Sequence, residues 1–179
     1  MQWPGKHSSL TVRSRTTAKT WNRQEQNRNR GRVVVRNVLF LCTGNSARSI
    51  LAEVLMNDLG RGAFRAYSAG SQPVGEVNPG AIEKLTAAGH SVDGLASKSW
   101  DEFSGEDAIA FDLVVTVCDN AAGEACPVWN GSPVTLHWGV PDPVACEDTG
   151  ERRRAFDHAY DELRARITEF LQSSGELHV

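Results

Sequence analysis

Long hydrophobic runs are absent from this sequence of 179 residues, of which 40% are hydrophobic and 23% charged. No window approaches 18 consecutive apolar residues, the longest stretch being Val38–Leu41 and its near neighbours, which excludes a membrane span and a membrane partner. The four cysteines include no Cys-x-x-Cys pair and no regular spacing, which argues against a disulfide scaffold and a zinc ribbon. The composition predicts a soluble globular protein whose thiols serve another purpose.

Acidic residues are almost missing from the first 36 positions. This segment contains nine Lys or Arg and one acid, Glu25, so its net charge is +8, which leaves −11 for the other 143 residues of a chain whose net charge is −3. Residues 1–32 also lack a helical or strand period, and we expect them to form a disordered basic tail. A transit-like peptide, a nucleic-acid-binding arm and a translated leader upstream of the true start are three explanations. The leader is favoured, because a compact domain begins abruptly at Val33.

From Val33 onward, segments with the pattern of strands alternate with segments of helical period. Strands are predicted at residues 33–41, 64–68, 111–117 and 133–138. Helices are predicted from the loop after the first strand to Leu59, from Asn78-Pro79 to Gly89, and along an apolar stripe from Phe156 to Leu171. This alternation predicts one α/β domain over residues 33–173, with a short tail at 174–179. Ligands of parallel sheets bind at the carboxyl ends of strands, where Cys42 and Cys118 are expected.

The segment Cys42–Ser49 has the composition of an oxyanion-binding loop. A cysteine, five residues and an arginine lie between a buried strand and a helix, so backbone N–H groups can surround a tetrahedral anion while Arg48 binds two of its oxygens. The same field, with Ser49 as hydroxyl donor, should lower the thiol pKa from about 8.5 to between roughly 4 and 7 and make Cys42 a nucleophile. The alternative is an inert buried cysteine. The candidate oxyanion-binding residues are Thr43, Gly44, Asn45, Ser46, Ala47, Arg48 and Ser49.

Three separated segments, Val38–Ser49, Asp112–Cys126 and His137–Pro143, resemble the arsenate reductases built on the low-molecular-weight protein tyrosine phosphatase fold. The resemblance extends from Asn37 to about Leu171. It implies a three-layer α/β/α fold with a four-stranded parallel sheet in the order 2-1-3-4, a monomer, and thiol-dependent reduction of arsenate to arsenite in bacterial cytoplasm. The first segment alone does not separate reductases from phosphatases, because arsenate and phosphate share shape and charge.

The remaining cysteines favour a reductase. Reducing arsenate requires two electrons: Cys42 attacks arsenic, Cys118 attacks the adduct, and Cys126 resolves the first disulfide. The segment 119–125 between the last two thiols is rich in small residues and is expected to be a flexible loop. A phosphatase needs neither thiol. The alternatives are two small core residues or a zinc site, the latter disfavoured by seven intervening residues without nearby His pairs. Cys146 is assigned no role.

Asp142-Pro143 supplies a candidate general acid, a carboxyl group that protonates the leaving oxygen in either reaction. The alternative is an ordinary turn aspartate. His137 and Trp138 are expected to pack at the end of a strand. Position 47 is Ala, where phosphatases of this fold and some of the reductases carry a second cysteine, and Val144 replaces the aromatic residue typical of the phosphatases. Both departures count against the phosphatase.

The partners follow from this chemistry. We expect arsenate as substrate, phosphate or sulfate as competing anions, no bound cofactor and no nucleic acid. The external reductant is thioredoxin, which suits a Cys118–Cys126 disulfide, or glutaredoxin with glutathione. The resemblance also allows a monovalent-cation site near Asn45, Glu53 and Ser68, whose side chains could equally be ordinary braces. Three functions stand in order: an arsenate reductase, a phosphatase acting on phosphate monoesters, and a non-catalytic oxyanion-binding regulatory module.

Overall fold

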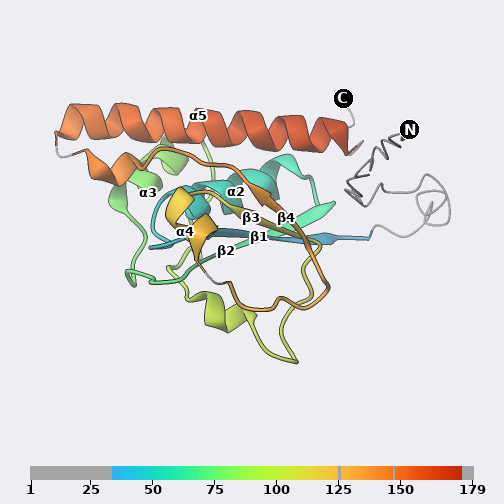
Figure 1. Ribbon diagram of the computed structural model, residues 1–179. Helices are drawn as coiled ribbons and strands as arrows, with labels where there is room; N and C mark the ends of the chain where they lie inside the picture. Colours follow the sequence, from blue (N-terminus) through green and yellow to red (C-terminus); the bar gives the residue numbers. More distant parts are fainter. Residues whose placement is uncertain (1–33, 125, 147, 175–179) are drawn as a thin grey trace, which may run out of the picture. The chain divides into compact units, whose positions relative to one another are not determined.

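Four parallel strands form the centre of the protein in a computed structural model that describes residues 34–124, 126–146 and 148–174 (Figure 1). The predicted tail at 1–32 and residues 175–179 of the predicted C-terminal tail lie outside the described residues. The strand order is β2-β1-β3-β4, which confirms the expected topology. The strands are β1 (Arg36–Cys42), β2 (Phe64–Gly70), β3 (Leu113–Thr116) and β4 (Val134–His137).

The first strand begins three residues later than predicted. Val34 and Val35 are exposed, and the first pair in the sheet is Arg36 with Phe64. At the other end, Cys42 lies opposite Gly70, while Leu41 lies opposite Thr116. The carboxyl ends of the three strands β2, β1 and β3 therefore meet at one edge, as the parallel sheet requires.

Three helices cover one face of the sheet: α2 (Arg48–Leu59), α3 (Pro79–Ala87) and α5 (Thr149–Ser173) (Figure 1). The close approach of α3 and α5 requires glycine at position 80, because a Cβ atom there would lie 2.5 Å from the ring of Phe156. Helix α5 begins seven residues before the predicted apolar stripe. Within the described ranges, no helix has the length and apolar character needed to cross a membrane.

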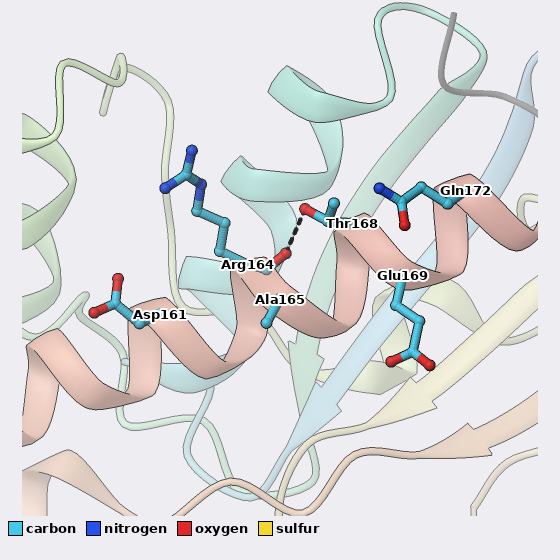
Figure 2. Close-up of a pocket in the computed structure, with 6 residues that line it drawn as sticks. All are labelled: Asp161, Arg164, Ala165, Thr168, Glu169 and Gln172. Atoms are coloured by element: carbon cyan, nitrogen blue, oxygen red, sulfur yellow. Dashed lines mark hydrogen bonds between the residues drawn. The ribbon is translucent and has the colours of Figure 1, made fainter. Parts of the chain in front are cut away.

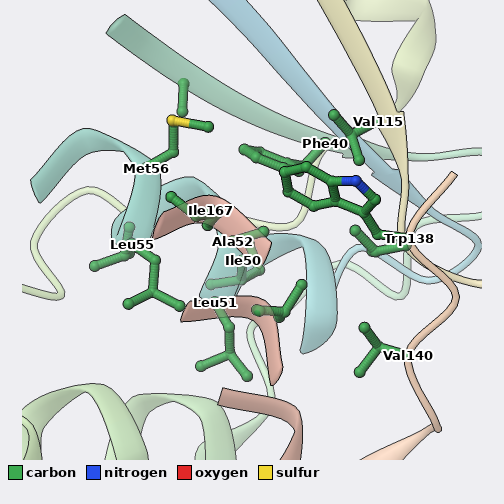
Figure 3. Packing of buried hydrophobic residues seen from close by; sticks show 14 of the residues in the cluster. Phe40, Ile50, Leu51, Ala52, Leu55, Met56, Val115, Trp138, Val140 and Ile167 are labelled. Atoms are coloured by element: carbon green, nitrogen blue, oxygen red, sulfur yellow. The ribbon is translucent and has the colours of Figure 1, made fainter. Parts of the chain in front are cut away.

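A large apolar cluster lies between the sheet and these helices (Figure 3). Trp138 is nearly buried there, with its ring centroid 6.0 Å from that of Phe40 and 6.2 Å from that of Phe170. Each large side chain in such a core stabilises the fold by about 1.5–3 kcal/mol. The expected packing role of Trp138 is confirmed. Further members of the cluster include Ile50, Leu51, Leu55, Met56, Val115 and Ile167.

The second face of the sheet has a thinner cover. Leu39 and Leu41 of β1 point into a smaller cluster with Phe103 and Phe111, while the alternate residues of β1 join the large cluster. This second layer consists of the short 3-10 helix η1 (Trp100–Phe103) and connecting segments. Strand β1 is therefore buried on both faces, which explains its nearly continuous apolar sequence.

Two short elements lie near the carboxyl ends of β3 and β4: α4 (Asp119–Gly123) and the 3-10 helix η2 (Pro143–Ala145). The prediction of a flexible loop over residues 119–125 is wrong for the first five of them. A helical turn forms because the sulfur of Cys118 accepts a hydrogen bond from the backbone N–H of Ala121, at 3.4 Å. An N-cap of this kind satisfies a donor that the first turn leaves unpaired.

Candidate active site

The loop between β1 and α2 is held from outside by the segment that follows β2. The carbonyl groups of Thr43, Gly44 and Ser46 accept hydrogen bonds from the backbone N–H groups of residues 72, 74 and 78, at 2.9 to 3.0 Å. At Gly70 a Cβ atom would lie 2.4 Å from the carbonyl oxygen of Thr43, so only glycine permits this approach. The loop thus has a defined conformation in which Asn45 adopts a positive φ of 43°.

The thiol of Cys42 lies inside this loop and is almost completely buried. Its sulfur hydrogen-bonds with the hydroxyl of Ser49 at 2.9 Å and accepts a hydrogen bond from the backbone N–H of Asn45 at 3.2 Å. Ser49 belongs to the first turn of α2, which begins at Arg48. The predicted contact between the thiol and Ser49 is therefore present, at a helix N-terminus that favours negative charge.

Arg48 and Asp142 are brought together by the fold, although 94 positions separate them in the sequence. One guanidinium nitrogen of Arg48 lies 3.1 Å from Asp142 Oδ2, and the other donates to the carbonyl oxygen of Val140 at 3.0 Å. Asp142 also accepts a hydrogen bond from the backbone N–H of Val144 at 3.1 Å and so caps η2. The two groups predicted to bind the anion and to protonate it form an ion pair with each other.

The predicted pKa of Cys42 needs correction. Burial raises the pKa of this thiol, and the hydrogen bonds from Ser49 and Asn45, which lower it, do not compensate. The sequence prediction assumed that the charge of Arg48 would stabilise the thiolate. In the structure the guanidinium contacts Asp142 and Val140, and burial is the largest influence on the pKa of Cys42.

Cys118 is buried beside the same loop. The backbone N–H of Val117 donates to the carbonyl oxygen of Leu41 at 2.8 Å, so residues 42 and 118 follow from hydrogen-bonded positions on neighbouring strands. The hydroxyl of Thr43 lies 3.7 Å from the sulfur of Cys118. The structure therefore brings two of the three proposed redox thiols together.

The third thiol differs from the other two in its exposure to solvent. Cys126 is exposed, and no hydrogen bond joins its sulfur to another residue in the described part of the chain. Partial burial and the carboxylate of Glu124 raise its pKa. Cys146 lies at the end of η2, where its carbonyl oxygen accepts a hydrogen bond from Arg152 at 2.8 Å.

A model of the family described as low molecular weight phosphotyrosine protein phosphatase matches residues 37–177. The chain belongs to this phosphatase family. The arsenate reductase of Halalkalibacterium halodurans is 36% identical over 137 residues, which cover 76% of this chain and 95% of that protein. The arsenate reductase of Bacillus subtilis is 34% identical over 137 residues, with the same coverage. The resemblance seen in the three sequence segments is confirmed.

Solved structures of this phosphatase family show the same likeness. The arsenate reductase from Archaeoglobus fulgidus has 29% sequence identity and a TM-score of 0.55, with 73% of this chain and 98% of that chain covered. The thioredoxin-dependent arsenate reductase of Corynebacterium glutamicum has 28% identity and a TM-score of 0.59, with 78% of this chain and 61% of that chain covered. The low-molecular-weight phosphatase-like fold is therefore shown.

Sequence reasoning missed a contact that holds α4 to β4. His137 hydrogen-bonds with the hydroxyl of Thr116 at 2.8 Å through Nδ1, and its Nε2 lies 3.1 Å from Asp119 Oδ1. Asp119 is the first residue of α4 and follows Cys118 directly. The histidine therefore fixes the start of this short helix, and no local pattern could have revealed a pairing across 18 positions.

The residues named for a monovalent cation, Asn45, Glu53 and Ser68, lie together but bind one another. The Asn45 side-chain NH₂ donates to Ser49 and Ser68 at 2.9 Å, and its oxygen accepts from the backbone N–H of Lys98 at 2.6 Å. Ser68 donates to Glu53 at 2.5 Å. The ammonium of Lys98 lies 3.6 Å from Glu53 Oε2, and the Asn45 NH₂ group faces the same site, so this set does not fit a metal ion while Lys98 is present. No group of three or more His, Cys, Asp or Glu able to hold a metal occurs among the described residues.

We expect Glu53→Gln to change how stability depends on pH. Burial raises the pKa of Glu53, while the hydrogen bond from Ser68 and the charge of Lys98 lower it. Because the folded carboxyl then holds its proton more tightly than the unfolded one, whose pKa is about 4.3, the stability that it contributes is present at low pH and lost as pH rises through the folded-state pKa. As the pH rises from about 4 to 7, the free energy of unfolding of the native protein should therefore fall relative to that of Glu53→Gln.

Urea denaturation at several pH values measures this difference. Glu83→Gln is the matched control for net charge, because Glu83 lies on the exposed side of α3 and pairs with Arg153 at 3.1 Å. If the curves of Glu53→Gln and the native protein run parallel from pH 4 to 7, the pKa of Glu53 is not raised in the folded protein.

A surface hollow lies along α5 and away from this site (Figure 2). Its walls are side chains of that helix alone, and the hydroxyl of Thr168 donates to the carbonyl oxygen of Arg164 at 2.7 Å. The hollow contains no thiol. The lining residues are Asp161, Arg164, Ala165, Thr168, Glu169 and Gln172.

Proposed function

We propose that this protein reduces arsenate to arsenite, with Cys42 as nucleophile and Cys118 and Cys126 as a disulfide relay. The observation that carries the proposal is the buried thiol of Cys118 beside the loop of Cys42, where the hydroxyl of Thr43 lies 3.7 Å from the Cys118 sulfur. A hydrolytic phosphatase has no use for a second thiol in this position. The relatives named arsenate reductase support the same conclusion.

The first step begins with exchange of the partners of Arg48. A bound arsenate presents two oxygens to the guanidinium group of Arg48. The guanidinium breaks its ion pair with Asp142 and forms a bidentate contact with these oxygens instead. Cys42 then forms a sulfur–arsenic bond and gives up its thiol proton. An arsenate hydroxyl combines with that proton, delivered by the carboxyl group of Asp142, and leaves as water. The raised pKa of Cys42 suits this step, since the thiol brings the proton that the leaving oxygen needs.

The second step transfers two electrons. The sulfur of Cys118 attacks the sulfur of Cys42, a disulfide bond forms, and the sulfur–arsenic bond breaks. Its electron pair stays on arsenic, which leaves as arsenite, and the Cys118 proton ends on an arsenite oxygen. Thr43, which follows Cys42 in the loop, lies with its hydroxyl 3.7 Å from the Cys118 sulfur and so helps to align the attack.

The third step regenerates Cys42. Once Cys118 bonds to Cys42, its sulfur is withdrawn from the N–H of Ala121, and α4 loses the cap that holds its first turn. Unwinding of α4 then lets the exposed Cys126 attack Cys118, which releases Cys42 as a thiol. An external dithiol reduces the Cys118–Cys126 disulfide. Thioredoxin is the reductant that we propose, as the thioredoxin-dependent relative from Corynebacterium glutamicum suggests.

Arsenate turnover measured with thioredoxin, and separately with glutaredoxin plus glutathione, tests this function. We expect turnover with thioredoxin. Activity with glutathione and glutaredoxin alone would assign the resolving step to an external thiol. No reduction with either donor, beside strong hydrolysis of phosphotyrosine, would make the protein a phosphatase, for which Cys42, Arg48 and Asp142 suffice.

Asp142→Asn should separate anion binding from chemistry. The amide oxygen can still accept from the N–H of Val144 and cap η2, but it supplies no proton, so single-turnover arsenate reduction should slow by about 10² to 10⁴. Phosphate should still protect Cys42 from alkylation, because Arg48 loses a competing carboxylate.

Asp157→Asn provides the matched control. Asp157 pairs with Lys84 at 2.6 Å and its side chain is 50% exposed, against 45% for Asp142, but it lies on α5 outside the site. Its variant should react at the native rate. Equal single-turnover rates for Asp142→Asn and the native protein would reduce Asp142 to a turn residue.

A further inference from the structure

Lys98 contacts the buried network behind the oxyanion loop at three points. Its backbone N–H donates to the side-chain oxygen of Asn45 at 2.6 Å, and its carbonyl oxygen accepts from Gly70 at 2.9 Å. Its ammonium group lies 3.6 Å from Glu53 Oε2 and donates to the carbonyl oxygen of Ala96 at 3.2 Å. The side chains of Lys98 and Glu53 are only 20% and 14% exposed, so water screens this ion pair weakly.

A continuous series of hydrogen bonds leads from this ion pair to the catalytic thiol. Glu53 accepts from Ser68, whose hydroxyl oxygen accepts from the Asn45 NH₂ group. The same NH₂ group donates to Ser49, which hydrogen-bonds with Cys42. Asn45, Ser49 and Ser68 are completely buried. A change in the charge balance at Glu53 therefore reaches the loop through groups that have no water to replace their partners.

The conformation of Asn45 depends on these contacts. Its φ of 43° lies in the left-handed region, which costs energy for any residue other than glycine. Bonds to both ends of its side-chain amide, from Lys98 on one side and to Ser49 and Ser68 on the other, hold it there. The Asn45 backbone N–H that points at Cys42 is placed by this conformation.

We propose that the ammonium of Lys98 is the internal cation of this network and that Lys98, acting through Glu53, Ser68 and Asn45, is a positioning residue for the oxyanion loop. It takes the place of the monovalent metal ion for which the sequence suggested a site, and the loop needs no such ion. The inference rests on the proposed function only in treating Cys42 as the thiol that meets the oxyanion.

The physical reason lies in the carboxylate of Glu53. A buried carboxylate that has lost its cation either takes up a proton or recruits a cation from solution. In the native protein Lys98 supplies the charge covalently. Removing that charge should loosen the loop and leave a carboxylate that responds to added potassium.

The test compares the native protein with Lys98→Met, and uses Lys84→Met as control. Lys84 is also 20% exposed and paired with a carboxylate, at 2.6 Å from Asp157, but lies on α3 away from the loop. The measured quantity is the phosphate concentration that half-protects Cys42 from alkylation, followed on the Cys42 peptide by mass spectrometry. Each protein is measured in potassium chloride and in tetramethylammonium chloride at equal ionic strength, with thermal unfolding recorded alongside.

We expect the native protein and Lys84→Met to give the same half-protecting concentration in both salts. Lys98→Met should need about fivefold more phosphate in tetramethylammonium chloride and should recover part of this loss in potassium chloride. Potassium dependence of the native protein would overturn the proposal without any variant. The proposal would also fail if Lys98→Met matched the native protein. It would fail as well if Lys98→Met lost phosphate affinity without recovering it in potassium chloride, because a packing role of Lys98 alone predicts that result.

This test does not measure arsenate turnover, so its result can be interpreted even if the protein has no reductase activity. Failure of phosphate to protect native Cys42 would remove the oxyanion site itself and overturn both the proposed function and the role of Lys98. Native protection with an unaltered Lys98→Met would overturn only the latter.

Discussion

Cys42→Ser should lower arsenate turnover by at least about 10³-fold and leave the fold intact. A serine hydroxyl is a much weaker nucleophile than a thiol and can form neither the sulfur–arsenic bond nor the disulfide that follows, so the adduct and the two-electron step that depends on it are both lost. The hydroxyl is smaller than the thiol and can still accept from the N–H of Asn45 and bond with Ser49. Turnover with thioredoxin and the thermal unfolding midpoint are the two measurements.

Cys146→Ser is the matched control, because Cys146 lies at the end of η2 and contributes only its carbonyl oxygen to a hydrogen bond with Arg152. This variant should turn over arsenate at the native rate. Native activity in Cys42→Ser, or loss of activity in Cys146→Ser alone, would show that the nucleophile is not Cys42 of the oxyanion loop.

Substituting the other two thiols should stop the cycle at different points. Cys126→Ser should release one equivalent of arsenite and then stall as a Cys42–Cys118 disulfide, because the buried Cys118 is already beside the loop. Cys118→Ser should stop before that disulfide forms. Mass spectrometry of the protein after arsenate treatment, without added reductant, reads each trapped state directly.

Slow hydrolysis of a small aryl phosphate is the internal control for these variants. It needs Cys42, Arg48 and Asp142 and returns the sulfur of Cys42 without oxidation, so it should persist when either relay thiol is serine. Its loss would point to a damaged site rather than a broken relay. Repeated arsenate reduction by both variants with thioredoxin would contradict the intramolecular relay and make an external thiol the resolver.

The ion pair between Arg48 and Asp142 gives the site a resting arrangement. While the guanidinium contacts Asp142 and Val140, burial dominates at Cys42 and keeps its pKa high. In the mechanism proposed above, anion binding would draw Arg48 to the substrate and free the Asp142 carboxyl for proton transfer. The proposal therefore couples the reactive state of the thiol to the presence of an oxyanion.

The sequence by itself determined the order of the strands and helices and the spacing of the first motif. Hydrophobic periodicity is a local property, so the buried strand before Cys42 and the apolar stripe of α5 can be predicted without a structure. The same holds for the loop, since Cys42 and Arg48 are joined by five residues that can only turn between a strand and a helix. The parallel sheet follows from the alternation of these elements.

Only the tertiary structure decided which side chains meet. Thr43 and Cys118 are 75 positions apart, and Arg48 and Asp142 are 94 apart, so their contacts depend on how strand ends and loops converge at one edge of the sheet. Desolvation of Cys42 likewise arises from packing that no local pattern contains, which is why the predicted direction of its pKa was wrong. The ion pair between Lys98 and Glu53 could not be predicted either, because charge pairing depends on distance in space and the sequence records only distance along the chain.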